Sequence, residues 1–173
     1  MRNRYILAPA AALALLLSAC SQTRKSETKE TPRKRQSERA PDLFRAKFET
    51  SRGDFTVEVH RDWAPRGADR FYNLLEDGFF NESRFHRVVR NFIVQFGING
   101  DPSISRLWNN LVIPDDPPKQ KNAKGTITFA VRGPSTRSTQ VFINLRDNGA
   151  TLDKSGFVPF GKVIEGMDVV ERL

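Results

Sequence analysis

The chain contains the stretch Phe85-His86-Arg87-Val88-Val89-Arg90-Asn91-Phe92-Ile93-Val94-Gln95, and the shorter stretch Gln140-Val141-Phe142-Ile143 follows some 45 residues later. Apolar residues dominate both stretches, and the first one is interrupted at Arg90-Asn91, which predicts a strand, a turn and a second strand. Together they place Arg87, Gln95 and Gln140 among aromatic and aliphatic side chains. This mixture is typical of an apolar ligand cleft with a few oriented polar groups.

In order and approximate spacing, these two stretches resemble the motifs of the cyclophilins, a family of peptidyl-prolyl cis-trans isomerases. The resemblance runs from about Phe44 to the end of the chain. It implies that Arg87 is the catalytic residue and that no cofactor is required. It also implies a pocket for the proline of the substrate, made by Phe92, Ile93, Gln95, Ala130, Val131, Gln140, Phe142, Leu152 and Phe157.

The chain departs from the family pattern at several of these positions. Ile93 stands where many members have methionine, an exchange of similar volume that a pocket tolerates. Val131 stands where many have an asparagine whose backbone contacts the peptide, and the backbone contact does not depend on the side chain. The position where some members have tryptophan falls near Thr151, and Phe157 stands where some have histidine. We therefore expect weak binding of the macrocyclic inhibitor cyclosporin.

Other interpretations of the same residues remain open. Outside the motif, Arg87 would be an ordinary surface arginine, the aromatic residues could be core packing, and both glutamines could serve structural hydrogen bonds. No recognisable motif places a serine, cysteine or acid beside His86, so we do not expect His86 to act as a nucleophile or as a general base. His60 and His86 also lack the neighbours of a metal site, and none is predicted.

The first twenty residues have the order of an export signal. Arg2 and Arg4 precede the apolar run Ile6–Leu17, which is too short to span a bilayer comfortably. The run ends in Leu17-Ser18-Ala19-Cys20, which resembles the lipobox of bacterial lipoproteins. We expect acylation at Cys20 and a protein that is anchored in a membrane and faces the periplasm or the cell exterior. The alternative is a plain secretory signal in which Cys20 is incidental.

A charged linker is predicted from residue 21 to residue 42. It has almost no apolar side chains and is therefore expected to be disordered. Its seven basic residues include Arg33-Lys34-Arg35, which could contact an anionic surface, although a solvated spacer is the simpler interpretation. Of the net charge of +8, three units lie in this linker and two in the signal segment. The remaining part is too weakly basic to suggest a nucleic-acid partner.

The residues from 43 to 173 are expected to form one cyclophilin-like domain. Alternating apolar residues predict a hairpin around Ser51–Asp54, and Pro65 and Gly78 delimit a helix of about three turns. Residues 101–122 are rich in proline and are expected to form a long loop that Trp108 anchors. Further strands are predicted at 125–130, 140–144 and 157–163, and the opening of a helix at 165–173.

The predicted fold is mainly β, a closed antiparallel barrel flanked by helices. The resemblance implies one more strand after the last helix, so the barrel is expected to lack its final strand. The predicted function is isomerisation of Xaa-Pro bonds in unfolded or flexible exported polypeptides, by a monomer. The alternative is a non-catalytic chaperone or scaffold that binds proline-containing peptides at the membrane. An adhesin that acts through its basic linker is a third, weaker possibility.

Overall fold

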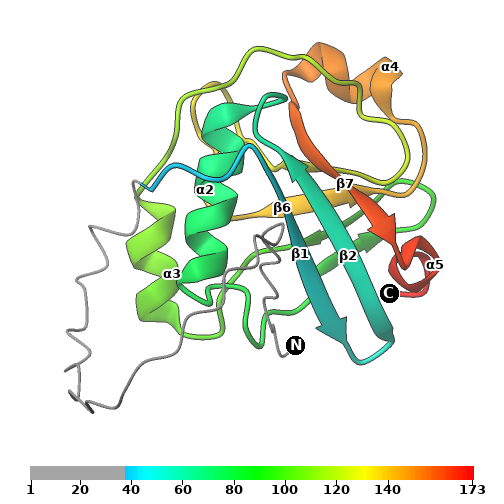
Figure 1. Ribbon diagram of the computed structural model, residues 1–173, viewed down its shortest axis with the longest axis horizontal. Coiled ribbons are helices and arrows are strands. Elements are labelled where there is room, and N and C mark those ends of the chain that lie inside the picture. Colours follow the sequence, from blue (N-terminus) through cyan, green and yellow to red (C-terminus); the bar gives the residue numbers. More distant parts are fainter. Residues whose placement is uncertain (1–37) are drawn as a thin grey trace, which may run out of the picture.

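The computed structural model describes residues 38–173 (Figure 1). The segment 1–20 with Cys20, and residues 21–37 of the predicted linker, lie outside the described residues. Among the residues that are described, no helix is both long enough and apolar enough to cross a membrane.

An antiparallel sheet of seven strands forms the centre of the described domain. The strands are β1 (Leu43–Thr50), β2 (Gly53–His60), β3 (Arg87–Val89), β4 (Ile93–Phe96), β5 (Thr126–Phe129), β6 (Val141–Asn144) and β7 (Pro159–Glu165). Their spatial order is β1-β2-β7-β5-β6-β4-β3. Every strand predicted from the sequence is present, and the turn between β3 and β4 contains Asn91 with a φ of 56°. Asparagine tolerates this left-handed conformation better than most residues do.

The sheet is not seen to close into the barrel expected from the sequence. Strands β1 and β3 lie at opposite ends of the strand order, and no pairing joins them within residues 38–173. Alternation of apolar and polar residues predicts that a strand exists but not which partner its outer edge takes. The expectation of a missing final strand stays a prediction.

Helices flank this sheet, and three of them, over 102–109 and 149–155, were not expected from the sequence. They are α2 (Pro65–Glu76), α3 (Pro102–Asn109), α4 (Gly149–Leu152), the 3-10 helix η1 (Asp153–Ser155) and α5 (Met167–Glu171). Helices α2 and α5 agree with the sequence prediction, but the expected loop over 101–122 was wrong in its first part. Asp101 caps α3 by accepting a hydrogen bond from Ser103 N at 2.7 Å, and Pro102 occupies the first turn. These are ordinary helix-start signals that the many prolines of the segment obscured.

Phenylalanine rings fill the space between α2 and the sheet. Phe48 stacks on Phe55 across the β1–β2 hairpin, and Phe71 of α2 packs between Phe80 and Phe160. Trp108, expected as an anchor, is 2% exposed and packs against Phe79. Such large buried rings contribute most of the apolar area that stabilises a core.

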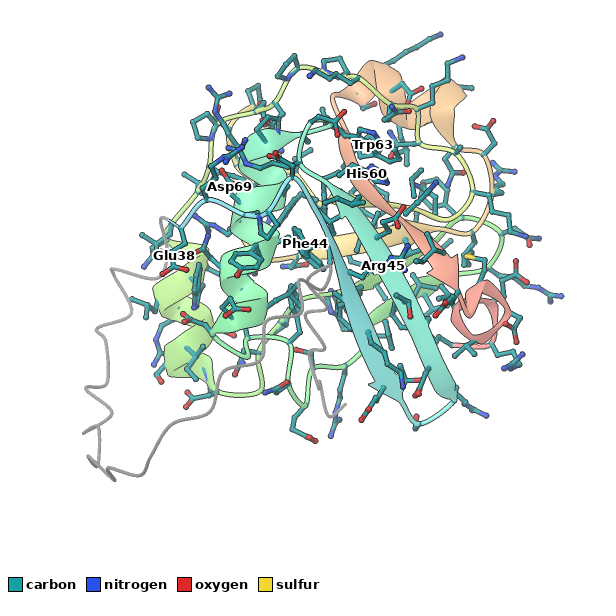
Figure 2. All side chains as sticks on the ribbon, in the orientation of Figure 1. Glu38, Phe44, Arg45, His60, Trp63 and Asp69 are labelled. Carbon is teal, nitrogen blue, oxygen red and sulfur yellow. The ribbon has the colours of Figure 1, made fainter. Side chains whose placement is uncertain are left out.

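The described chain begins with a short segment that packs on α2, earlier than the predicted end of the linker at residue 42. Ala40 is buried, and its N–H donates to Asp69 Oδ1 at 2.9 Å. Glu38 N donates to Asn73 Oδ1 at 3.2 Å, and Asn73 Nδ2 donates back to Glu38 O at 2.8 Å. Figure 2 labels Asp69, which belongs to this helix, and Glu38, which lies beside it. The ordered domain therefore includes residues 38–42, because polar side chains of α2 satisfy their backbone.

Candidate active site

Strand register places three of the predicted site residues in one row. In the β3–β4 pair Arg87 lies opposite Gln95, and in the β4–β6 pair Gln95 lies opposite Phe142. Alternation along β4 sends Val94 and Phe96 into the main core, whereas Ile93 belongs to a separate cluster. The two stretches that stood apart in the sequence are therefore neighbours on one face of the sheet.

Arg87 is held by a short chain of hydrogen bonds. Its Nη1 donates to Gln95 Oε1 at 3.2 Å, and Gln95 Nε2 donates to Gln140 Oε1 at 2.8 Å. Both glutamines are half-buried, while Arg87 itself is exposed at the mouth of a cleft. Only one of the guanidinium donors is used in this chain, so others remain available to a ligand.

Beside Arg87 lies an apolar pocket that is distinct from the main core. Ile93, Phe142 and Leu152 form its buried centre, with 3%, 2% and 6% exposure. Val89, Phe92, Ala130 and Phe157 pack around that centre. The rings of Phe142 and Phe157 meet edge to face, with their centroids 5.5 Å apart. A flat apolar ring could enter here without disturbing the core.

The whole cleft has a volume of about 670 Å³. The structure places all ten sequence-predicted residues in its lining: Arg87, Phe92, Ile93, Gln95, Ala130, Val131, Gln140, Phe142, Leu152 and Phe157. Sequence reasoning missed the other members of the lining, which are Asn109, Val112, Arg132, Thr136 and Ser138. Thr136 and Ser138 directly precede the Gln140 stretch, a signal that could have pointed to them.

A buried network of asparagines supports the floor of the pocket. Asn148 Nδ2 donates to Phe92 O at 2.9 Å and to Asn144 Oδ1 at 2.8 Å. Asn122 Nδ2 donates to Phe157 O and to Asp153 Oδ1, each at 2.8 Å. Asn144 Nδ2 in turn donates to Asn122 Oδ1 at 3.2 Å. The network therefore ties together the backbone of two pocket walls, and no sequence motif had indicated it.

Two buried arginines hold the opposite wall of the cleft against α2. Arg70 donates to the carbonyl oxygens of Leu111 and Ser138, and its guanidinium lies 5.3 Å from the centroid of the Trp108 ring. Burial, and then the nearby charge of Arg137, lower the pKa of Arg70 to about 10. Arg70 therefore stays charged at neutral pH and fixes the two segments that carry Val112 and Ser138.

Comparison with known proteins decides the family of the chain. The family description "Cyclophilin type peptidyl-prolyl cis-trans isomerase/CLD" matches residues 45–173. The chain belongs to this family. Peptidyl-prolyl cis-trans isomerase B of Escherichia coli is 31% identical over 134 residues, which cover 73% of this chain and 81% of that protein. A peptidyl-prolyl cis-trans isomerase of Acinetobacter baylyi is 31% identical over 139 residues, which cover 73% and 69%.

Solved structures agree with a cyclophilin fold. A cyclophilin-type isomerase of Cryptosporidium parvum superposes with a TM-score of 0.63 at 24% identity, covering 75% of this chain and 84% of that one. The same protein crystallised in the presence of the dipeptide Ala-Pro gives a TM-score of 0.60, again at 24% identity, with coverage of 72% and 83%. At this identity the likeness establishes the fold. The activity class comes from the family and its named isomerases.

Neither histidine of this cyclophilin lines the cleft. His86 is exposed, and its backbone N–H donates to Gln95 O at 3.2 Å. His60 lies at the end of β2, where its ring stacks on Trp63 with centroids 4.2 Å apart (Figure 2). Within the described part of the chain, no group of three or more His, Cys, Asp or Glu side chains could hold a metal ion. Among the polar residues of the lining, Arg87, Gln95 and Gln140 form the hydrogen-bonded chain described above.

Proposed function

We propose that this chain isomerises Xaa-Pro bonds in unfolded or flexible polypeptides outside the cytoplasm, with Arg87 as its catalytic residue. The observation that supports this best is the pairing of a braced guanidinium with an apolar pocket in a single cleft. The family supplies the reaction class. The residue roles, the exported substrates and the assistance to folding are our inference.

The chemistry needs neither a nucleophile nor a redox group. Rotation about the amide bond has a barrier of about 18–20 kcal/mol, because the nitrogen lone pair is delocalised into the carbonyl. A donor directed at the prolyl nitrogen localises that lone pair as the bond twists. Arg87 would provide this donor, since its guanidinium stays protonated and presents several N–H groups in rigid geometry. It would stabilise the twisted state more than either planar state, which is the requirement for acceleration.

The apolar pocket would fix the proline ring while the preceding carbonyl moves. Phe92, Ile93, Phe142 and Leu152 would contact the ring, with Ala130 and Phe157 at its margin. The backbone at Val131, together with Gln95 and Gln140, would contact the peptide on either side. Holding one side of the bond still converts binding energy into orientation of the reacting bond.

An isomerase assay with a matched control tests this proposal. Isomerisation of a short Xaa-Pro peptide is followed by exchange NMR for the wild type, Arg87→Ala and Arg90→Ala. Arg90 is an exposed arginine of the same hairpin that does not line the cleft. We expect Arg87→Ala to lose roughly 100-fold or more of its kcat/KM, comparable to the loss of an oxyanion donor, and Arg90→Ala to keep the wild-type value. Equal activity of all three proteins would remove Arg87 from the mechanism.

The main competing function is proline-peptide binding without turnover, as in a chaperone or scaffold tethered to the membrane. In that case Arg87→Ala would keep much of the peptide affinity, and the wild type would leave the exchange rate of the peptide unchanged. Peptide titration followed by NMR measures both quantities on one sample. The proposal also requires only one copy of the chain, and we expect a monomer in analytical ultracentrifugation.

We further propose that acylation of Cys20 anchors the domain to a membrane, facing the periplasm or the cell exterior. The support is the order of residues 1–20, in which basic residues, an apolar run and a small-residue site precede Cys20. Labelled palmitate should enter the wild-type chain in cells and should not enter Cys20→Ala. Labelling that persists in Cys20→Ala would overturn the anchor and leave the isomerase proposal untouched.

A further inference from the structure

The charges that line the cleft are all positive. Arg87 and Arg132 contribute guanidinium groups, and no aspartate or glutamate is among the lining residues. The ion pairs of residues 38–173 include neither arginine, and Arg87 makes a single side-chain hydrogen bond, to Gln95. A ligand in this cleft therefore meets two cations that the domain itself does not neutralise.

The backbone on which Arg132 stands is fixed. Arg132 N donates to Thr136 Oγ1 at 2.9 Å, and the same hydroxyl donates to Gly133 O at 2.7 Å. Ser135 N donates to Asp115 Oδ2 at 2.8 Å, which ties the turn to the neighbouring loop. The side chain of Arg132 is exposed, but its starting point is set by these three bonds.

Asp115, which binds this turn, and the adjacent Asp116 are committed to other groups. Asp116 is buried and receives Arg137 Nη1, Arg66 N and Gly67 N at 2.9 to 3.0 Å. Asp115 lies 3.4 Å from Arg137 Nε and accepts from Ser135 N. Because these carboxylates are engaged, they do not supply Arg132 with an internal partner.

The distance between Arg132 and the ring pocket corresponds to a short stretch of peptide. Ala130 packs in the apolar cluster, and Arg132 follows two residues later along the cleft wall. Two residues of backbone span at most about 7 Å, so a peptide whose proline occupies the pocket would present a residue within about two positions of it to Arg132. A second hollow of about 330 Å³ shares Val131, Arg132 and Phe157 with the cleft, and its lining also includes Asp115.

We propose that this cleft prefers substrates with a carboxylate side chain within two residues of the proline, and that Arg132 recognises it. The proposal rests on the isomerase function above and names the substrate class of the same site. Glutamate and aspartate would gain a cationic partner, lysine would be repelled, and a neutral residue would be accepted without preference. Because Arg132 is exposed, the selectivity is modest, of the order of threefold to fivefold in kcat/KM at low salt.

Peptides that differ only in charge test the proposal. Four sets of short Xaa-Pro peptides are compared, one set for each of the two positions before and the two positions after the proline. Within a set, the peptides carry Glu, Gln or Lys at that position. Their kcat/KM values are measured with the full chain as wild type, Arg132→Gln, Arg132→Lys and Arg52→Gln. Arg52 is an exposed arginine at the turn between β1 and β2 that lies outside the cleft lining, so it controls for the loss of one charge.

We expect a Glu-to-Gln ratio of about three to five in the wild type for at least one position, decreasing toward one as salt is added. Arg132→Gln should bring this ratio close to one, Arg132→Lys should retain part of it, and Arg52→Gln should retain all of it. A wild-type ratio of one at all four positions, or a ratio that survives in Arg132→Gln, would overturn the inference. If no peptide is turned over, the isomerase function fails instead, and the same ratios measured as binding affinities by NMR decide the charge preference.

Discussion

Arg137 and Asp116 form an ion pair with 2.9 Å between Nη1 and Oδ2, in which both side chains are only 2% exposed. Asp116 also receives the backbone N–H groups of Arg66 and Gly67 at the start of α2, where the helix dipole favours a negative charge. Arg137 in addition donates to Pro114 O. This pair therefore joins the helix that covers the sheet to the segment that leads into the cleft wall.

Substitution of Asp116 by alanine should strongly destabilise the domain. It would leave the guanidinium of Arg137 buried without its partner and would uncap α2, so we expect the free energy of unfolding to fall by about 3–5 kcal/mol. Urea denaturation of both proteins measures the difference. Glu171→Ala is the control, because its pair with Lys124 is exposed and should contribute no more than about 1 kcal/mol. Equal losses of unfolding free energy in the two variants would show that the buried pair stabilises the domain no more than the exposed pair does.

Gln95 should affect turnover mainly through Arg87, and its own contact with the peptide should matter less. Gln95→Ala removes the acceptor of Arg87 Nη1 and the donor to Gln140, so the guanidinium loses its orientation. A hydrogen bond to a charged group contributes about 1.5–3 kcal/mol, and we expect kcat to fall by about 10-fold or more while KM changes little. A double-mutant cycle with Arg87→Ala provides the check. Additive effects of the two substitutions would contradict a role that operates through Arg87.

The pair of Arg45 and Glu58 should make part of the stability depend on pH. Arg45 Nη2 lies 3.0 Å from Glu58 Oε2 across the β1–β2 hairpin, and His60 Nε2 lies 3.1 Å from Glu58 Oε1. Burial by itself raises the pKa of Glu58, but Arg45 and then His60 outweigh it, so this pKa lies below the ordinary value of 4.5. The stabilisation is therefore complete above pH 4.5 and is lost as the pH falls through the lowered pKa.

Unfolding free energies measured at several pH values check this sign. The difference between wild type and Glu58→Gln should be largest at neutral pH and should shrink as the pH decreases below 4.5. In the background of Arg45→Gln, the same substitution should show a weaker dependence, because the main favourable partner is gone. A difference that grows with acidification would contradict the assignment.

Cyclosporin should inhibit this isomerase only weakly. In the sequence resemblance, the exposed Thr151 falls near the position where some cyclophilins have tryptophan, and Phe157, which packs in the apolar pocket, falls where some have histidine. We expect the combined substitution Thr151→Trp and Phe157→His to increase cyclosporin affinity while leaving the ring pocket in place. Titration of the isomerisation assay with cyclosporin measures the inhibition of the wild type and of the double variant. Nanomolar inhibition of the wild type would refute the prediction.

The sequence was sufficient to predict most of the local structure, because strand alternation and helix boundaries depend on residues that are close together in the chain. The hairpin of β1 and β2, the helix α2 and the strand pair around Arg90-Asn91 all follow from such patterns. The resemblance also named ten residues that the structure gathers in one cleft. The sequence-based prediction missed α3, because the many prolines of the segment obscured the capping signal at Asp101. It also missed the ordered residues 38–42, because their partners on α2 are distant in sequence.

By itself, then, the sequence determined the family, the strands and the identity of the residues around Arg87. Tertiary structure alone decided that Asn109, Val112 and Arg132 share the cleft, that buried asparagines join two pocket walls, and that the strand order runs from β1 to β3 without a pairing between them in the described chain. The physical reason is the range of the interactions. Periodicity and capping act within a few residues, whereas hydrogen bonds such as that of Asn148 to the Phe92 carbonyl join positions 56 apart and exist only once the chain is packed.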